Sequence, residues 1–340
     1  MITLRAVSST ALVIIRTIIL IAALAGCTGL PRYGVTLPPL PPGSMQADET
    51  ATMPDGAQLP VRRWLPAGRP VAVVLALHGF NDSRNAWELP GPVFAAAGIA
   101  VFAPDQRGFG AAPMRGFWPG DGVLAADAAT MLRQLRARFP GVPLFAMGES
   151  MGAAVLMTVA AGPSPPPVDG WILLAPAVWG RQQMGVLLSS GLWLVSGLAP
   201  GLSLTGAEVP IRVVASDNRD ALIRLARDPL TIRRTRIDSL RGLTDLMDDA
   251  QDAAPAMRGH VLVAYGGHDM LVPPDAMARA WLAMPEAAAQ AYYPAGYHLL
   301  LRDKDRATRM ADIIAWIKDP SARLPSGADI AAAIWRAARE

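Results

Sequence analysis

Charge and cysteine are both scarce in this sequence. Only 17% of the 340 residues are charged, the formal net charge is +3, and Cys27 is the single cysteine. One thiol excludes an intramolecular disulfide and any zinc site built from several cysteines. The small net charge, without a polybasic tract, excludes the electrostatic footprint of a nucleic-acid-binding protein. We therefore expect no nucleic-acid partner.

Metal and cofactor motifs are missing as well. Metal binding has no support, because His268 and Asp269 alone supply too few ligands. Gly108 and Gly110 lack the third glycine at the spacing of a dinucleotide-binding loop. The sequence thus predicts neither a metal nor a cofactor.

Hydrophobic residues, by contrast, are abundant. They make up 52% of the chain, and the mean hydropathy is +0.28. This much apolar surface can offset the entropy of ordering a core, which excludes disorder for most of the chain. The length allows one large α/β domain or two ordinary domains.

Residues 1–26 have the pattern of a signal peptide. Arg5 and Arg16 make the amino-terminal region positive, an apolar stretch follows, and small residues precede Cys27. The uncharged stretch 17–31 has 15 residues, fewer than the ~20 that a transmembrane helix needs. An ordinary secretory signal with an incidental cysteine is the alternative interpretation.

The end of this segment, Leu24-Ala25-Gly26-Cys27, resembles the lipobox of bacterial lipoproteins. The resemblance implies that Cys27 is diacylated and anchors the mature chain in the cell envelope. It also implies the outer membrane, on its periplasmic side, because Thr28 stands where aspartate would signal retention in the inner membrane. Residues 27–46 are rich in proline without apolar periodicity, so they predict an extended tether between the membrane and the domain.

Unbroken aliphatic runs recur along the rest of the chain and predict strands that are covered on both faces. These runs are 71–77, 99–103, 142–147, 171–174, 260–264 and 289–293. Helix-like segments lie between most of them, for example 121–139 and 275–284, and Asp55-Gly56 predicts a hairpin turn. Alternating strands and helices predict an α/β fold with a mostly parallel, doubly wound sheet.

The alternation of short strands and helices is interrupted between the runs 171–174 and 260–264. This interval of about 80 residues exceeds a normal crossover connection several-fold. We interpret residues 179–255 as an inserted helical cap, or lid, with the core formed by 47–178 and 256–325. Six arginines make the cap locally basic, which is typical of a solvated helix face, with attraction to anionic lipid headgroups as the alternative. They are Arg224, Arg227, Arg233, Arg234, Arg236 and Arg241.

One stretch of the cap, 182–207, contains no charge for 26 residues, which raises the question of a membrane span. Its several glycine and serine residues argue against a span. Its position does too, because a span there would place the two halves of one sheet on opposite sides of a membrane. The stretch therefore predicts a lid helix, with a buried core helix as the other alternative.

Gly148-Glu149-Ser150-Met151-Gly152 is a G-x-S-x-G motif between the run 142–147 and an alanine-rich helical segment, 153–161. A strand, a sharp turn and a helix form the context of the nucleophile elbow, which projects a serine hydroxyl above the edge of the sheet. The glycines leave room for so tight a turn. Ser150 is therefore the candidate nucleophile.

A serine hydroxyl needs a base, and the base needs an acid to orient it. His298 follows the last predicted strand, and Asp269 directly follows the run 260–264. The chain order Ser150, Asp269, His298 is that of the α/β-hydrolases. Three aspartates are nearby competitors for the acid, and we expect them to cap or solvate helices instead. They are Asp245, Asp248 and Asp303.

An oxyanion hole needs two backbone N–H groups aimed at the developing negative charge. Met151, directly after the nucleophile, and Phe80, in the loop after the run 71–77, are the candidate donors. We expect His78 and His268 to be structural, His268 because adjacent residues of an extended segment point in opposite directions. Arg107 and Asp127 are likewise interpreted as structural.

Several motifs together resemble the monoacylglycerol lipase and lysophospholipase branch of the α/β-hydrolases, also called serine aminopeptidase-like hydrolases. They are Leu77-His78-Gly79, Pro104-Asp105-Gln106-Arg107-Gly108-Phe109-Gly110, the elbow, Gly267-His268-Asp269 and Gly296-Tyr297-His298. The resemblance covers residues 46–317, including Asp228-Pro229-Leu230 of the cap. Glu149 and Ala153 depart from it, because many members have histidine and glycine at these positions.

The sequence therefore predicts a lipid-anchored serine hydrolase that cleaves carboxylic esters through an acyl-enzyme. The resemblance and the apolar lid imply an acyl-chain substrate such as a monoacylglycerol or a lysophospholipid. One alternative keeps the three residues in a small-ester esterase or a peptidase. The other is a non-catalytic envelope lipoprotein, against which the complete set of serine, histidine and aspartate argues.

Overall fold

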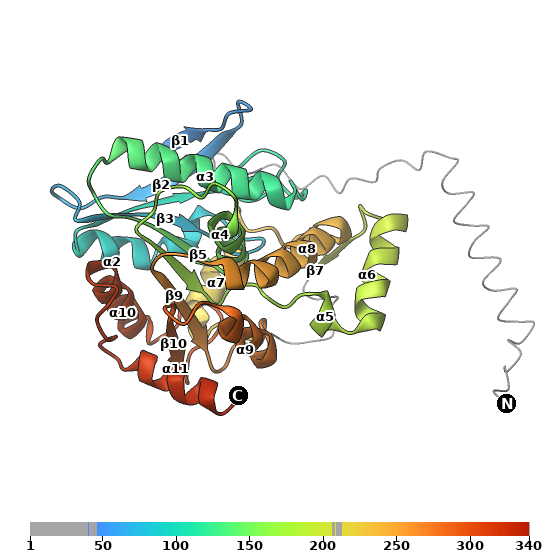
Figure 1. The fold of residues 1–340 in the computed structure, drawn as a ribbon. Coiled ribbons are helices and arrows are strands. Elements are labelled where there is room, and N and C mark those ends of the chain that lie inside the picture. Colours follow the sequence, from blue (N-terminus) through green and yellow to red (C-terminus); the bar gives the residue numbers. More distant parts are fainter. Residues whose placement is uncertain (1–39, 41–45, 206–207, 209–212, 340) are drawn as a thin grey trace, which may run out of the picture.

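The computed structural model describes residues 40, 46–205, 208 and 213–339 (Figure 1). The predicted signal segment 1–26, Cys27 and most of the tether 27–46 lie outside these residues. Within the described residues, no helix is both long enough and apolar enough to cross a membrane.

A central eight-stranded sheet has the order β1-β2-β4-β3-β5-β6-β9-β10. Its strands are β1 (Glu49–Thr52), β2 (Gln58–Trp64), β3 (Ala72–Leu77), β4 (Ile99–Pro104), β5 (Leu144–Glu149), β6 (Gly170–Leu174), β9 (Val261–Gly266) and β10 (Ala289–Tyr293). The six strands from β4 to β10 pair in parallel, whereas β1 and β2 form an antiparallel hairpin on one edge. The predicted mostly parallel sheet and the hairpin at Asp55-Gly56 are confirmed.

Helices cover both faces of the sheet, as Figure 1 shows. One face packs against α3 (Asp121–Arg138), α4 (Met151–Ala161) and α9 (Pro274–Ala283). The other packs against η1 (Arg84–Trp87), α2 (Pro90–Ala96) and α10 (Arg306–Lys318). Every residue of β3, β4, β5, β6 and β9 is buried, which explains why these strands have unbroken aliphatic runs.

The core continues past residue 325, where the predicted domain ends. There α11 (Ala328–Ala337) packs along β10, the last strand of the sheet. Trp335 of this helix lies against Trp281 and Tyr292, with ring centroids 4.9 and 5.3 Å apart. The helix therefore covers the edge strand and buries aromatic surface that residues 256–325 alone would leave exposed.

Within its described residues, the cap contains four α-helices and a small antiparallel pair of strands. These are α5 (Arg181–Met184), α6 (Val186–Leu198), β7 (Ser203–Thr205), α7 (Arg219–Arg227), β8 (Arg234–Arg236) and α8 (Ile237–Ala253), with η3 (Ala254–Ala256) leading back to the core. Figure 1 shows α6 beyond α8, on the side away from the central sheet. The uncharged stretch thus forms a lid helix of 13 residues, as predicted.

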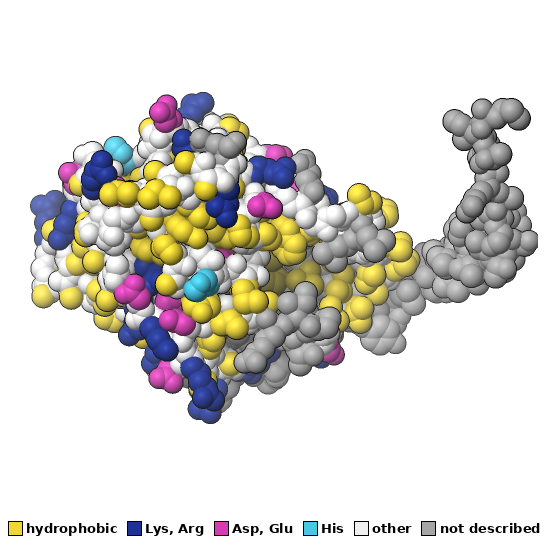
Figure 2. Space-filling model, turned by 90° about the horizontal axis from the view of Figure 1, so that it is seen from below, with side chains coloured by type: hydrophobic (Ala, Val, Ile, Leu, Met, Phe, Trp, Pro, Cys, Tyr) yellow, Lys and Arg dark blue, Asp and Glu magenta, His cyan; other side chains and the backbone are white. Residues whose placement is uncertain are grey.

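The lid helix exposes large hydrophobic side chains. Val186 is 82% and Trp193 61% exposed, and Leu194 and Leu198 are about half exposed. Figure 2 shows hydrophobic side chains gathered at this end of the molecule. The apolar surface of the uncharged stretch is therefore not all used in packing against the core.

Candidate active site

Ser150 lies at a sharp turn between the central strand β5 and helix α4. Its backbone has φ 53° and ψ −114°, a conformation that L residues adopt only when the surroundings impose it. Two hydrogen bonds impose it here: the Ser150 N–H donates to the Leu174 carbonyl at 2.9 Å, and the Ser150 carbonyl accepts from the Ala177 N–H at 3.1 Å. The end of β6 thus holds the predicted elbow in place.

The two glycines of the motif are required by close approach of backbone. A Cβ at Gly148 would lie 2.4 Å from the carbonyl carbon of Gly152, and a Cβ at Gly152 would lie 2.4 Å from the carbonyl oxygen of Leu77. Because these neighbours are backbone atoms, they cannot move aside as a flexible side chain could. The turn therefore packs directly onto the end of β3.

His298 and Asp269 are hydrogen-bonded to each other. The distance from His298 Nδ1 to Asp269 Oδ2 is 2.8 Å, and both side chains are buried. The other carboxylate oxygen, Oδ1, accepts from the N–H groups of Leu271 at 2.8 Å and Val272 at 3.0 Å. The carboxylate is thereby fixed on both sides, and it orients the imidazole.

The environment of His298 favours a protonated ring. Burial acts against the charged form, but the charge and hydrogen bond of Asp269, with a contribution from Glu149, outweigh it. The pKa of His298 is therefore raised above the ordinary value of an imidazole. A base with a raised pKa accepts a proton more readily, at the cost of being deprotonated only at higher pH.

Ser150 and His298 line one cavity of about 620 Å³ between the sheet and the cap. Most of its wall is apolar, and much of that wall comes from the cap. The cap residues with large apolar side chains are Trp179, Met184, Leu192, Leu225, Leu240, Leu243 and Met247. The volume lies within the ~300–1,000 Å³ of ordinary ligand pockets, and its apolar wall suits a hydrocarbon chain.

One of the two predicted oxyanion donors lines this cavity, and the other adjoins a residue that lines it. Phe80 lines it, and Met151 follows Ser150 as the first residue of α4. In the described part of the chain, neither the Phe80 nor the Met151 N–H donates to a backbone oxygen outside its own element.

A buried ionic cluster lies directly beside the serine. Arg302 Nη2 donates to Glu149 Oε1 at 2.8 Å and to Asp82 Oδ2 at 2.5 Å, and all three side chains are at least nine-tenths buried. Burial raises the pKa of Glu149, although the Arg302 guanidinium opposes this shift. Glu149 and Asp82 also line the cavity. The motifs contain no signal for Asp82 or Arg302, because the three residues come from distant parts of the chain.

The aspartates that compete with Asp269 have other partners. Asp303 accepts from Ser216 Oγ at 2.7 Å and from the Tyr297 N–H at 2.9 Å. Asp245 and Asp248 form ion pairs with Arg181 on the cap. Of the four predicted candidates, only Asp269 contacts His298.

The other motif residues have structural roles in the described chain. His78 Nε2 accepts from the Gln106 N–H at 3.0 Å, so its Nδ1 donates to the Gly79 carbonyl at 2.8 Å. Arg107 binds both carboxylate oxygens of Asp127 at 2.9 Å. His268 is exposed and packs on a tyrosine ring. These contacts agree with the structural interpretation of His78, Arg107 and Asp127.

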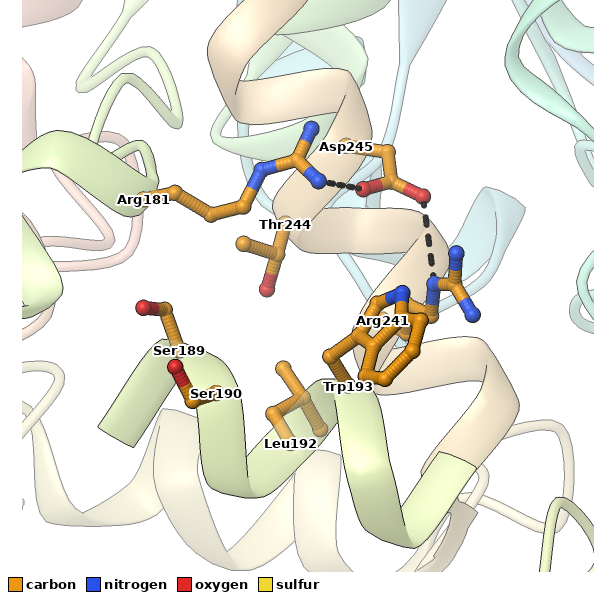
Figure 3. A pocket seen from close by; sticks show the side chains of 8 residues that line it. All are labelled: Arg181, Ser189, Ser190, Leu192, Trp193, Arg241, Thr244 and Asp245. Carbon is orange, nitrogen blue, oxygen red and sulfur yellow. Dashed lines mark ion pairs between the residues drawn. The ribbon is translucent and has the colours of Figure 1, made fainter. Parts of the chain in front are cut away.

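A second, smaller cavity of about 280 Å³ lies between α6 and α8 (Figure 3). It shares Leu192 and Thr244 with the larger cavity. Figure 3 shows Arg181 and Arg241 reaching Asp245 from both sides, at 3.1 and 3.8 Å. The carboxylate thus offsets part of the positive charge of this cavity.

Other cap arginines are also paired. Arg224 lies 3.1 Å from Glu88, and Arg236 lies 2.5 Å from Asp238. Within the described residues, no group of three or more histidine, cysteine, aspartate and glutamate side chains is arranged to hold a metal ion.

Comparison with known proteins gives one family match. The model of the family described as serine aminopeptidase, S33 matches residues 68–305 of this chain. The monoacylglycerol lipase of Mycolicibacterium smegmatis is 25% identical over 264 residues, which cover 75% of this chain and 90% of that protein. The monoglyceride lipase of Homo sapiens is 27% identical over 281 residues, which cover 79% of this chain and 89% of that protein.

Solved structures share the fold. A soluble variant of monoglyceride lipase from Saccharomyces cerevisiae, in complex with a substrate analog, superposes with a TM-score of 0.67 at 18% identity, covering 85% of this chain and 98% of that one. The monoacylglycerol lipase of Paleococcus ferrophilus superposes with a TM-score of 0.64 at 20% identity, covering 76% and 98%. At these identities the likeness concerns the α/β-hydrolase architecture.

Proposed function

Because the chain belongs to the serine aminopeptidase, S33 family and is a serine ester hydrolase, we propose that it hydrolyses monoacyl esters through Ser150, His298 and Asp269. The proposal rests on how the three side chains are arranged around one cavity. Ser150 and His298 line the same apolar cavity, and the Nδ1 of His298 is occupied by a buried, doubly anchored carboxylate.

The proposed mechanism begins with proton transfer from Ser150 to His298. Since Nδ1 is engaged with Asp269, Nε2 is the nitrogen that takes the proton as the serine oxygen attacks the ester carbonyl. Asp269 stabilises the imidazolium, and the N–H groups of Phe80 and Met151 stabilise the oxyanion. His298 then gives the proton to the leaving alcohol, and water hydrolyses the acyl-enzyme by the same steps.

The shape and lining of the cavity support a single-chain acyl ester as the substrate. An apolar wall supplied by the cap would bury a hydrocarbon chain, at about 0.8 kcal/mol per CH₂ group. The lipases among the relatives are named for substrates of this class. We therefore propose a monoacylglycerol or a lysophospholipid as the natural substrate.

The test is a substrate series on the full chain solubilised in detergent. We expect kcat/KM to rise with acyl length from acetate to laurate esters, and to be far lower for an aminoacyl amide. Ser150→Ala should abolish activity and fluorophosphonate labelling, whereas Ser164→Ala, on an exposed loop, should change neither. A preference for the amide would replace the lipase proposal with a peptidase, and a preference for acetate with a small-ester esterase.

We further propose that the enzyme is anchored through Cys27 on the periplasmic side of the outer membrane. The support is the lipobox-like end of the segment 1–26 together with the proline-rich stretch that follows. Cys27→Ser should move the protein from the membrane fraction to the soluble periplasmic fraction without changing its specific activity. Unchanged membrane association of this variant would refute the anchor and leave the catalytic proposal intact.

A further inference from the structure

The loop that contains Phe80 is bonded directly to the cap. Asn81 Nδ2 donates to Thr235 Oγ1 at 2.6 Å, and the Asn81 carbonyl accepts from the Ile232 N–H at 2.9 Å. Ile232 and Thr235 belong to the cap segment that leads through β8 into α8. One residue of the core is thus held by two hydrogen bonds to the cap.

Asn81 has a backbone conformation that needs such support. Its φ is 61°, in the left-handed region that few residues other than glycine adopt, and asparagine is among those that tolerate it. The direction of the preceding peptide depends on this conformation. Asn81 directly follows Phe80, so the hydrogen bonds from the cap help to fix the orientation of the peptide next to the oxyanion donor.

The same part of the cap also forms part of the cavity wall. Leu240, Leu243 and Met247 of α8 line the cavity only a few residues after Thr235. A second contact connects the same two parts, because the Phe80 ring packs against Trp118, at 6.3 Å between centroids, and Trp118 packs against Gly242 of α8. A change in the position of α8 would therefore alter contacts on both sides of Phe80.

We propose that Asn81 is a positioning residue that couples the cap to the oxyanion hole, so that the seated cap aims the Phe80 N–H at the substrate oxygen. The inference rests on the proposed function, since it assumes that this N–H stabilises the oxyanion. An acyl chain that fills the cavity and holds α8 in place then stabilises the geometry that the transition state needs. The acyl chain contributes in this way to kcat as well as to KM.

The test compares variants of Asn81 and Thr235 on a long-chain ester. Thr235→Val removes the hydroxyl but keeps the shape of the side chain, and Thr235→Ser keeps the hydroxyl. Asn81→Gly keeps access to the left-handed conformation but removes the amide. We expect Thr235→Val and Asn81→Gly each to lower kcat about tenfold to a hundredfold, the range expected when a catalytic group is misplaced by a fraction of its working distance. KM should change little, and Thr235→Ser should retain most of the activity.

Asn85 supplies the matched control. Its Nδ2 donates to Asp228 Oδ2 of the cap at 2.9 Å, but it lies in η1, away from the cavity wall. Asn85→Ala removes this bond and the one that Arg62 Nη1 donates to Asn85 Oδ1, so it should lower the melting temperature at least as much as Thr235→Val while leaving kcat unchanged. The double variant Asn81→Gly/Thr235→Val should be no slower than the slower single variant, because both remove the same bond.

Several outcomes would overturn the coupling. These are a wild-type kcat in Thr235→Val and Asn81→Gly, an equal loss of kcat in Asn85→Ala, or a loss confined to KM. If Thr235→Val does not fold, Asn81→Gly carries the same comparison. The proposed function is tested independently, because it predicts that Ser150→Ala is inactive whatever the cap variants do.

Discussion

Replacing Asp269 by asparagine perturbs a single carboxylate oxygen whose partners are all known. In the wild-type site, Oδ1 accepts from the N–H groups of Leu271 and Val272, and Oδ2 accepts from His298 Nδ1. The asparagine amide can adopt two orientations. If its oxygen stays at the position of Oδ1, both backbone bonds are kept and its NH₂ group faces His298.

The first orientation is favoured because the alternative loses two hydrogen bonds. Turning the amide over would point NH₂ at the Leu271 and Val272 N–H groups, which costs about 1–3 kcal/mol for each buried donor left without an acceptor. In the favoured orientation His298 must accept at Nδ1, so its proton moves to Nε2. That nitrogen can then no longer take the proton of Ser150, and we expect kcat to fall by about 10⁴, as in other hydrolases with the wrong tautomer.

The assay is kcat and kcat/KM for a chromogenic long-chain ester across pH, with thermal unfolding measured in parallel. Asp269→Asn should fold, since the amide keeps the size of the carboxylate and two of its hydrogen bonds. The acid limb of its residual activity should move to lower pH, because the carboxylate that raises the pKa of His298 is gone. Asp245→Asn, which removes only partly exposed ion pairs with Arg181 and Arg241 on the cap, should retain full activity. Activity of Asp269→Asn within tenfold of wild type would refute this account of the site.

Two further predictions concern the elbow. Glu149→Gln removes a negative charge that raises the pKa of His298, so the acid limb of kcat/KM should shift to lower pH, and an unchanged limb would show that Glu149 carries no charge in the working enzyme. Gly152→Ala places a Cβ 2.4 Å from the carbonyl oxygen of Leu77 and should cost about 3 kcal/mol in the free energy of unfolding, measured with urea. Gly122→Ala, in a helix with nothing within 4 Å of the new Cβ, should instead be neutral or stabilising, and equal losses in the two variants would contradict the steric argument.

The sequence predicted the sheet and the elbow well because both have local signals. A strand buried on both faces needs an unbroken aliphatic run, and β3 and β6 show this directly. The elbow has its two glycines because backbone contacts leave no room for a Cβ. The pairing of His298 with Asp269 was predictable because the carboxyl ends of parallel strands lie at the same edge of a sheet.

The ionic cluster and the cap contacts could not be predicted in this way. Arg302 is 153 residues from Glu149 and 220 from Asp82 along the chain. Asn81 is 154 residues from Thr235. No periodicity or spacing links residues that are brought together only by the folded sheet and the seated cap. Helix α11 was not predicted either, because its apolar face can be recognised as part of the core only once it is placed beside β10.

Because the catalytic residues belong to the core and most of the cavity wall belongs to the cap, the substrate preference of such an enzyme can change separately from its catalytic geometry. Ser150, Asp269 and His298 all follow strands of the central sheet. Every residue of β5 and β9 is buried, and β10 pairs with β9, so these strands cannot move independently of one another. Most of the large apolar residues that line the cavity come from the cap instead. Substitutions in the cap can therefore alter the preferred acyl chain while the nucleophile and its base keep their geometry. Asn81 limits this freedom, because any cap that fails to hold Thr235 and Ile232 in place would also displace the peptide beside Phe80.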